Sequence, residues 1–217
     1  MIRLESRPSP AAVDRLTHLE QRRRELVSAG KELPNVVANG YREPVVKASI
    51  VAETYGKCAY CESKITHVYW GDVEHIIPKS KNPDGLLDYN NLTFACSICN
   101  GNKSDYHDPA MPLLNPYIDD LDLHILALGP FVWHRPADNH AETTIVLLKL
   151  NRPELVERRQ RRLTDISRLA DKYAALPEGV LRAAVHDQLC QEVESTGEFA
   201  FIIRNYLAQA GIDIDTT

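Results

Sequence analysis

The sequence predicts an α+β protein that is mainly α-helical, with a small β element in the middle of the chain. Apolar residues recur at helical spacing in the N-terminal and C-terminal parts, and prolines and glycines mark where these stretches begin and end. A central stretch instead has strand-like residues, Val73 and Ile76, followed by Pro78. The composition, 44% hydrophobic and 25% charged, is that of a globular chain able to bury a core.

The helices are expected in the following order along the chain. They cover residues 11–29, 44–55, 141–150, 153–175, 177–194 and 198–210. The first begins after Pro10 and ends before Gly30, the second ends before Gly56, and the fourth has Pro153 in its first turn, where helices tolerate proline. A short hairpin is expected within 121–135, around Gly129.

These elements divide the chain into three predicted regions. They are an N-terminal helical extension over 1–43, a central module over 44–117 that carries the paired cysteines, and a C-terminal helical region over 118–217. No run of about eighteen apolar residues indicates a membrane span, and the basic start of the chain lacks the apolar stretch of a signal peptide. We therefore expect a cytoplasmic protein with no membrane contact.

The net charge of −5 argues against a protein covered in positive charge, but the charge is unevenly distributed. Residues 1–47 hold nine Lys/Arg against six Asp/Glu, residues 152–182 hold eight against five, and residues 183–217 hold one against six. The two basic segments are either solvated helix faces or patches that contact phosphates.

Four of the five cysteines form two pairs with a two-residue gap, Cys58 with Cys61 and Cys96 with Cys99. Two such pairs around a folded insert are typical of a zinc site, because each tight turn presents two sulfurs from one side. Four thiolates leave no coordination position for water, so this zinc is expected to be structural.

The insert between the pairs carries the residues suited to chemistry. Glu74 and His75 are adjacent, so on a strand they point to opposite faces, and Pro78 ends that strand. A helix that begins after Cys96 would place four polar residues on one face, Asn100, Lys103, Ser104 and His107. A neutral histidine can take a proton from water, and carboxylate and amide oxygens suit Mg²⁺ or Mn²⁺.

Three motifs follow one another here: Asp72-Val73-Glu74-His75-Ile76-Ile77-Pro78-Lys79-Ser80, Asp88-Tyr89-Asn90-Asn91-Leu92, and Cys96-Ser97-Ile98-Cys99-Asn100-Gly101-Asn102-Lys103. In order and spacing, residues 58–103 resemble the zinc-knuckle branch of the HNH nuclease family. The resemblance implies a ββα-metal core, a β-hairpin and a helix around one catalytic metal, here held together by the four-cysteine zinc site. It also implies a metal-dependent endonuclease that hydrolyses phosphodiester bonds in nucleic acid, for which we expect DNA.

The family pattern assigns a role to each matching residue. His75 would be the general base, and Glu74 a metal ligand where many members have aspartate. Asn91 would tie the loop and orient the histidine, and Asn100 would be the second metal ligand where other members have histidine. These departures make the chain an H-N-N variant with Mg²⁺ or Mn²⁺ as the catalytic ion.

Five further residues are candidates for the same site. Asp72 is a spare ligand for the catalytic metal, and His107 completes the third HNH position if the helix extends that far. Lys103 is expected to contact phosphate. Arg159 and Arg162 face the apolar side of the predicted 153–175 helix, where they either contact the nucleic-acid backbone or form ion pairs with the acidic C-terminal segment.

The wider layout resembles a narrower family, the PtuB-type nucleases of the Septu and retron antiphage systems. The residues that carry this resemblance are Cys58-Ala59-Tyr60-Cys61-Glu62, Val73-Glu74-His75, Pro78-Lys79-Ser80, Ala95-Cys96-Ser97-Ile98-Cys99-Asn100 and the segment 144–151 with the arginine-rich helix after it. Such nucleases work beside an SMC-like ATPase, PtuA. The sequence has no Gly-x4-Gly-Lys-[Ser/Thr] phosphate loop, so ATP hydrolysis is expected to come from that partner.

Two alternatives remain open at this point. One is a stand-alone restriction-type HNH nuclease. The other is a non-catalytic zinc module that binds nucleic acid or protein, although such a module has no need for Glu74, His75 and Asn100 together.

Overall fold

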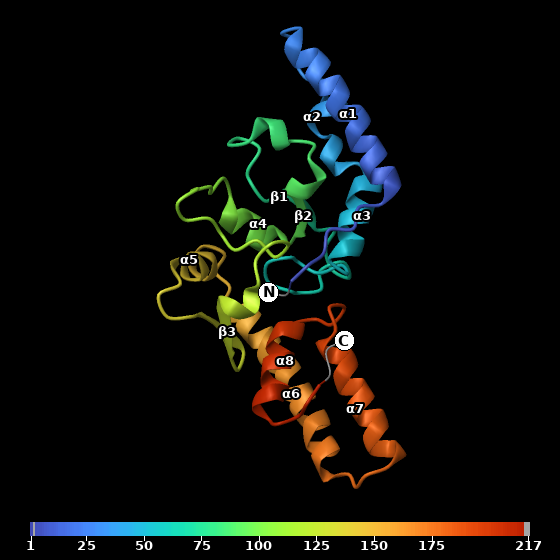
Figure 1. Cartoon of the computed structure of the whole chain (residues 1–217), viewed down its shortest axis with the longest axis vertical. Helices are drawn as coiled ribbons and strands as arrows, with labels where there is room; N and C mark the ends of the chain where they lie inside the picture. The colour runs from blue at the N-terminus through green and yellow to red at the C-terminus, as the bar shows by residue number, and fades with distance from the viewer. Residues whose placement is uncertain (2, 215–217) are drawn as a thin grey trace.

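The computed structural model describes residues 1 and 3–214, and its elements are arranged along one long axis (Figure 1). Helix α1 (Pro10–Ser28) lies at one end, and α6 (Pro153–Ala175) with α7 (Val180–Val193) lies at the other. Between them are the strands β1 (Asp72–His75) and β2 (Leu92–Ala95). The predicted fold class, mainly helical with a small central β element, is confirmed.

The remaining helices and strands are α2 (Asn35–Ala38), α3 (Pro44–Glu53), α4 (Ser97–Lys103), β3 (Ile125–Leu128), β4 (Phe131–His134), α5 (Asn139–Leu147) and α8 (Ala200–Gln209). Both sheets of the described residues are antiparallel two-stranded hairpins, β1 with β2 and β3 with β4. The second hairpin turns at Gly129, which has a φ of +57°, as the sequence predicts.

Helix boundaries follow local backbone signals. The Oγ of Ser9 accepts a hydrogen bond from the Ala12 amide at the start of α1, and Gly30, with a φ of +64°, follows its end. Helix α6 has the predicted bounds. Helix α7 begins three residues later than expected because Gly179, with a φ of +151°, interrupts the backbone after Pro177.

Two other helices are shorter than the sequence predicts, and each stops at a left-handed residue. Helix α3 ends at Glu53, before Tyr55 with a φ of +54°. Helix α5 ends at Leu147, before Lys149 with a φ of +50°. Apolar periodicity continues past both ends, but these backbone conformations cannot continue a right-handed helix.

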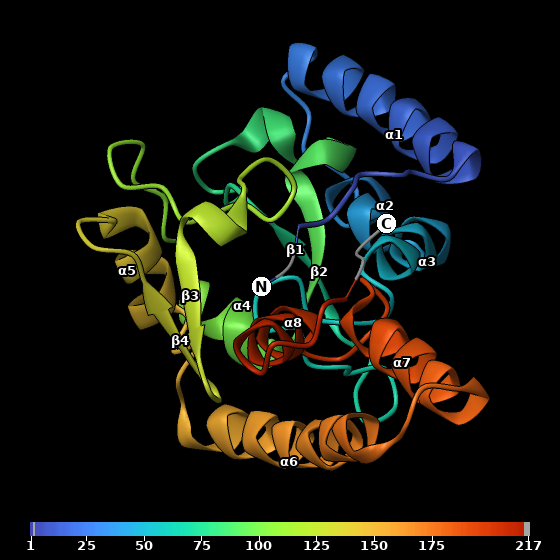
Figure 2. The ribbon, with the colours of Figure 1, turned by 60° about the horizontal axis from the view of Figure 1, so that its bottom comes forward.

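The hydrophobic core connects the three predicted regions. One buried cluster includes Leu19 of α1, Ile50 of α3, Phe94 of β2 and Leu155 of α6. The division into regions therefore stays a proposal about sequence modules, because their side chains share this core. A smaller cluster lies among the C-terminal helices, where α8 packs against α6 and α7 (Figure 2).

The helices in residues 1 and 3–214 include no candidate for a membrane span. None of the helices there combines the length and the apolar character that crossing a bilayer requires.

Candidate active site and cysteine cluster

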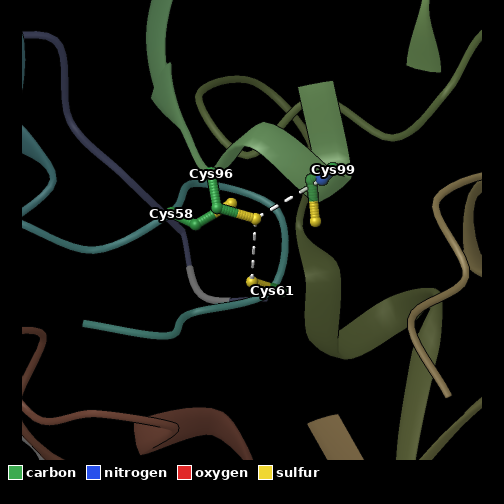
Figure 3. Close-up of side chains that lie close together, drawn as sticks. All are labelled: Cys58, Cys61, Cys96 and Cys99. Atoms are coloured by element: carbon green, nitrogen blue, oxygen red, sulfur yellow. Dashed lines mark hydrogen bonds between the residues drawn. The ribbon is translucent and has the colours of Figure 1, made fainter. Parts of the chain in front are cut away.

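The four paired cysteines converge on one point (Figure 3). Their sulfurs all lie within 4.8 Å of one another, and those of Cys61 and Cys96 are 3.9 Å apart. A tetrahedral zinc with Zn–S bonds of about 2.3 Å would separate its sulfurs by about 3.8 Å. The residues present therefore fit a tetrahedral thiolate-bound ion.

Two chain segments bring these sulfurs together. Cys58 and Cys61 lie in the tight loop after α3, where the amide of Ala59 donates to the carbonyl of Phe94 on β2 at 2.9 Å. Cys96 precedes α4 as its N-cap, and its sulfur accepts a hydrogen bond from the Cys99 amide at 3.4 Å. The cluster thus joins the loop after α3 to the β2–α4 corner.

An arginine from the C-terminal region lies beside this cluster. The Nη1 of Arg152 lies 3.8 Å from the sulfur of Cys99. Burial opposes the charged form of Arg152, but the Cys99 and Cys61 thiols raise its pKa above the usual value. Four thiolates around a divalent ion leave two negative charges uncompensated, and a guanidinium at this distance offsets part of that charge.

Helix α4 packs on the face of β1 that carries its acidic residues. The Nδ2 of Asn100 donates to the Oδ2 of Asp72 at 3.2 Å. One turn further on, the Nζ of Lys103 donates to the Oε1 of Glu74 at 2.7 Å and to the carbonyl of His75 at 2.9 Å. Asp72 and Glu74 share one face of the strand because they are two residues apart, and Asn100 and Lys103 share one face of the helix because they are three apart. Each helix residue therefore contacts one of the two carboxylates.

This face offers hard oxygen ligands. Because Asn100 uses its Nδ2 on Asp72, its Oδ1 is not engaged in that bond and remains an acceptor. Burial raises the pKa of Glu74, although the neighbouring Lys103 ammonium acts in the opposite direction. A carboxylate and an amide oxygen are a donor set that fits Mg²⁺ or Mn²⁺.

His75 lies at the end of β1, and its ring is fixed on both sides. Its Nε2 is 3.0 Å from the carbonyl of Leu86, and the ring of Tyr41 meets it edge-on with centroids 4.5 Å apart. A carbonyl accepts only, so Nε2 carries the proton and Nδ1 has the free lone pair. Burial lowers the pKa of His75, which keeps the imidazole neutral near pH 7.

Asn91 closes the loop between the two strands. Its Oδ1 accepts from the amide of Ile77 at 2.8 Å, and its Nδ2 donates to the carbonyl of Ile77 at 3.0 Å and to that of Gly85 at 3.3 Å. The loop closed in this way contains Leu86, whose carbonyl holds His75. Asn91 is therefore placed to act on the histidine through the backbone.

Two sequence-based expectations do not match the geometry on this face. Helix α4 ends at Lys103 because Ser104 has a φ of +49°, so His107 does not lie on the face that carries Asn100. His107 instead lines a cleft of about 260 Å³ whose walls also include Ile76, Ile77 and Lys103. Lys103 itself is 2% exposed, and two of its three N–H donors are taken by Glu74 and the carbonyl of His75, so its ammonium is directed into the protein and not toward a phosphate in solvent.

The arginines proposed as phosphate contacts are engaged within the protein. Arg159 is 1% exposed, its Nη1 donates to the carbonyl of Leu150 at 2.7 Å, and its guanidinium lies over the ring of Phe199. Enclosure of this kind does not support a backbone contact. Arg162 forms an ion pair with Glu192, as the alternative based on the acidic C-terminal segment predicts.

Sequence patterns alone did not reveal Tyr41, Leu86 or Arg152 as parts of these sites. The contribution of Leu86 is a backbone carbonyl, for which no side-chain pattern exists. Tyr41 follows the turn residue Gly40, and Arg152 directly precedes α6. Both lie beside element boundaries that the sequence marks, but their partners lie far away in the sequence. Only the folded chain brings them to His75 and Cys99.

A β-hairpin whose strand carries Glu74 and His75, a short helix against it and a four-cysteine cluster at their junction define an HNH endonuclease. In agreement, residues 58–106 match the family model described as HNH endonuclease. The retron Vc95 putative HNH endonuclease of Vibrio cholerae is 30% identical over 163 residues, which cover 68% of this chain and 73% of the relative. The chain belongs to the HNH endonuclease family.

Two further relatives bear the description Septu protein PtuB. The one from Bacillus thuringiensis is 29% identical over 110 residues, or 50% of this chain and 42% of the relative. The one from Bacillus mycoides is 26% identical over 191 residues, or 72% of this chain and 64% of the relative. The chain thus matches between two fifths and two thirds of the length of these two proteins.

Proposed function

We propose that this HNH endonuclease hydrolyses phosphodiester bonds in DNA as the effector nuclease of an antiphage system, with His75 as the general base. The observation that carries the proposal is the fixed ring of His75. Its Nε2 is held by the carbonyl of Leu86 at 3.0 Å, so Nδ1 is the nitrogen that would accept a proton from the attacking water.

The other residues of the site have complementary roles in this scheme. Glu74 and Asn100 would hold a Mg²⁺ or Mn²⁺ ion, with Asp72 as a further ligand. Such an ion, when bound, stabilises the charge that develops on the phosphate and on the leaving oxygen. Lys103 holds Glu74 in place and ties it to the backbone of His75, and Asn91 keeps the loop that carries Leu86 closed.

The cysteine cluster would hold a structural Zn²⁺. Its four thiolates leave no open position, and the cluster fixes the corner from which α4 starts. Because Asn100 lies one residue after Cys99, this ion would set the position of a ligand for the catalytic ion without taking part in hydrolysis.

The partner proposed is an ATPase of the SMC-like class. Its support is similarity to proteins described as Septu protein PtuB and to a retron HNH endonuclease. If the nuclease is gated in this way, the isolated chain is expected to cleave slowly and to accelerate when an SMC-like ATPase from the same system is added.

The test compares the parent chain with His75→Ala and with His18→Ala, which removes an exposed imidazole on α1. Each protein is incubated with supercoiled plasmid, single-stranded DNA and RNA, with Mg²⁺ or Mn²⁺, and with or without the proposed SMC-like ATPase, while zinc content is measured by metal analysis. We expect DNA cleavage to fall by at least ~100-fold in His75→Ala only, at unchanged zinc content. Equal cleavage by His75→Ala would remove His75 as the base, and cleavage of RNA alone would overturn the DNA assignment.

A further inference from the structure

Two exposed cations share the ring of one buried tyrosine near His75. The guanidinium of Arg42 lies 5.2 Å from the ring centroid of Tyr41, and the Nζ of Lys79 lies 5.4 Å from it. Lys79 also donates to the Tyr41 hydroxyl at 3.2 Å. The two cations come from the short turn Gly40–Arg42 and from the loop after β1, so the fold brings them together.

The ring of Tyr41 lies between His75 and the charged groups of Arg42 and Lys79, so it limits how far these groups are from His75. It is 2% exposed, and its ring centroid is 4.5 Å from that of His75. Adding the ring-to-ring and ring-to-charge distances places both cations within about 10 Å of the His75 ring. A nucleic-acid strand advances about 3.4 Å per phosphate along its axis, so this span covers up to about three nucleotides next to a phosphate at His75.

Among residues 1 and 3–214, no carboxylate forms an ion pair with Arg42 or Lys79, and both side chains are exposed. The carboxylate next in sequence, that of Glu43, accepts from the Nε of Arg15 at 2.6 Å. The two ring-centroid distances place these charges at most about 11 Å apart, and like charges at such a separation repel each other unless an anion lies between them.

The arginines of α6 show the contrasting situation. Arg158 pairs with Glu198 at 2.9 Å, and Arg161 pairs with Glu157. Such intramolecular pairs are the usual state of surface charges and leave little attraction for a ligand. Arg158 and Arg161 are therefore paired within the protein, whereas Arg42 and Lys79 are paired with no described carboxylate.

We propose that Arg42 and Lys79 form a clamp, organised by Tyr41, that binds the phosphodiester backbone of the substrate beside His75. The proposal rests on the proposed function for its substrate class and adds the residues that hold the strand. Tyr41 is the positioning residue of the clamp, since its ring carries both cations and contacts the base. Backbone phosphates lack sequence information, so the clamp binds any sequence and sets where the strand lies.

The N-terminal extension would accordingly contribute to substrate binding. Arg42 is the last residue of the turn that precedes α3, outside the stretch 58–106 that matches the HNH family model. The stretch that carries the family motifs would then bind nucleic acid fully only with this turn in place.

The test measures equilibrium binding by fluorescence anisotropy without added divalent metal, over a series of salt concentrations. The variants are Arg42→Ala, Lys79→Ala and the double variant, with duplex DNA, single-stranded DNA and single-stranded RNA of equal length. Arg161→Ala is the matched control, because it also removes one exposed, positively charged side chain.

We expect each clamp substitution to weaken binding about tenfold and to reduce the slope of log K against log salt by about 0.9 for duplex or about 0.7 for a single strand. The double variant should lose about twice that slope, while Arg161→Ala stays within about twofold of the parent. Arg42→Lys and Lys79→Arg, which keep the charge, should retain the parental slope. In cleavage assays the loss should appear in KM rather than in kcat.

A clamp variant whose slope equals that of the parent would overturn the proposal, as would equal losses in Arg161→Ala. Retained nucleic-acid binding with lost binding of the proposed SMC-like ATPase would also overturn it, because the cations would then serve a protein partner. The binding assay needs no cleavage. An inactive chain with a normal clamp response would therefore refute the proposed hydrolysis and leave the clamp standing.

Discussion

Gly71 lies directly before β1, in a position where a single added methyl group would meet the core. Its φ of +61° is in the left-handed region, and a Cβ built on it would lie 2.1 Å from the Cζ of Phe94 and 3.0 Å from the Cδ1 of Ile65. Phe94 is fully buried on β2, so it has no space into which to move. Gly71→Ala therefore combines backbone strain with overpacking.

Gly30 separates these two contributions. It has nearly the same φ, +64°, but a Cβ there would meet nothing within 4 Å. Gly30→Ala should cost only the left-handed backbone strain, about 1–2 kcal/mol. Gly71→Ala should cost that amount plus about 1–3 kcal/mol for the displaced aromatic ring, or about 2–5 kcal/mol in all.

Urea unfolding followed by far-ultraviolet circular dichroism, at a constant excess of zinc, measures both variants against the parent. The free energy of unfolding of Gly71→Ala should be lower than that of Gly30→Ala by more than 1 kcal/mol. If the two variants differ by less than about 0.5 kcal/mol, the packing of Phe94 against this turn does not constrain the strand as the structure indicates.

Two further predictions concern buried charges. Burial raises the folded-state pKa of Glu53 above its ordinary value of 4.5, so its stabilising contribution is complete below that pH and is lost as the pH rises through the folded-state value. Glu53→Gln, which keeps an acceptor for the Tyr89 hydroxyl, should therefore be more stable than the parent at pH 7–8 and equal to it near pH 4; a difference independent of pH in thermal unfolding would contradict this. Lys103→Met should lower the free energy of unfolding by about 3–5 kcal/mol, because it leaves the Glu74 carboxylate buried without its partner. Adding Glu74→Gln should recover most of this loss in a double-mutant cycle, and additive losses would show that the two side chains are not coupled.

The sequence predicted best those features that local chemistry determines. The bounds of α6 follow from a proline in the first turn and a long amphipathic repeat, and the cysteine cluster follows from two short spacings. The end of α4 was missed because Ser104 adopts a left-handed conformation that its residue type does not require. The polar residues recur at helical spacing as far as His107, but the helix itself ends at Lys103.

The contact partners of a side chain were harder to predict from the sequence than its position on a helix. The helical wheel correctly turned Arg159 toward the apolar side of α6, yet it gave no indication that a backbone carbonyl and an aromatic ring would receive the guanidinium. Lys103 had the right place on α4, but its bond to Glu74 depends on how the helix crosses β1. Such contacts join residues 29 or more positions apart or use the backbone, and neither leaves a local pattern.

The arginines around the cysteine cluster have a consequence for the order in which the chain matures during synthesis. Burial lowers the pKa of Arg159 to about 10, and the negative charges of Cys61, Glu62 and then Cys99 counteract that effect, so thiolate charge helps to keep this enclosed guanidinium protonated. Both Arg152 and Arg159 leave the ribosome long after Cys99. The cysteine cluster, although complete in its four side chains by residue 99, acquires this nearby positive charge only when the chain has been made as far as α6.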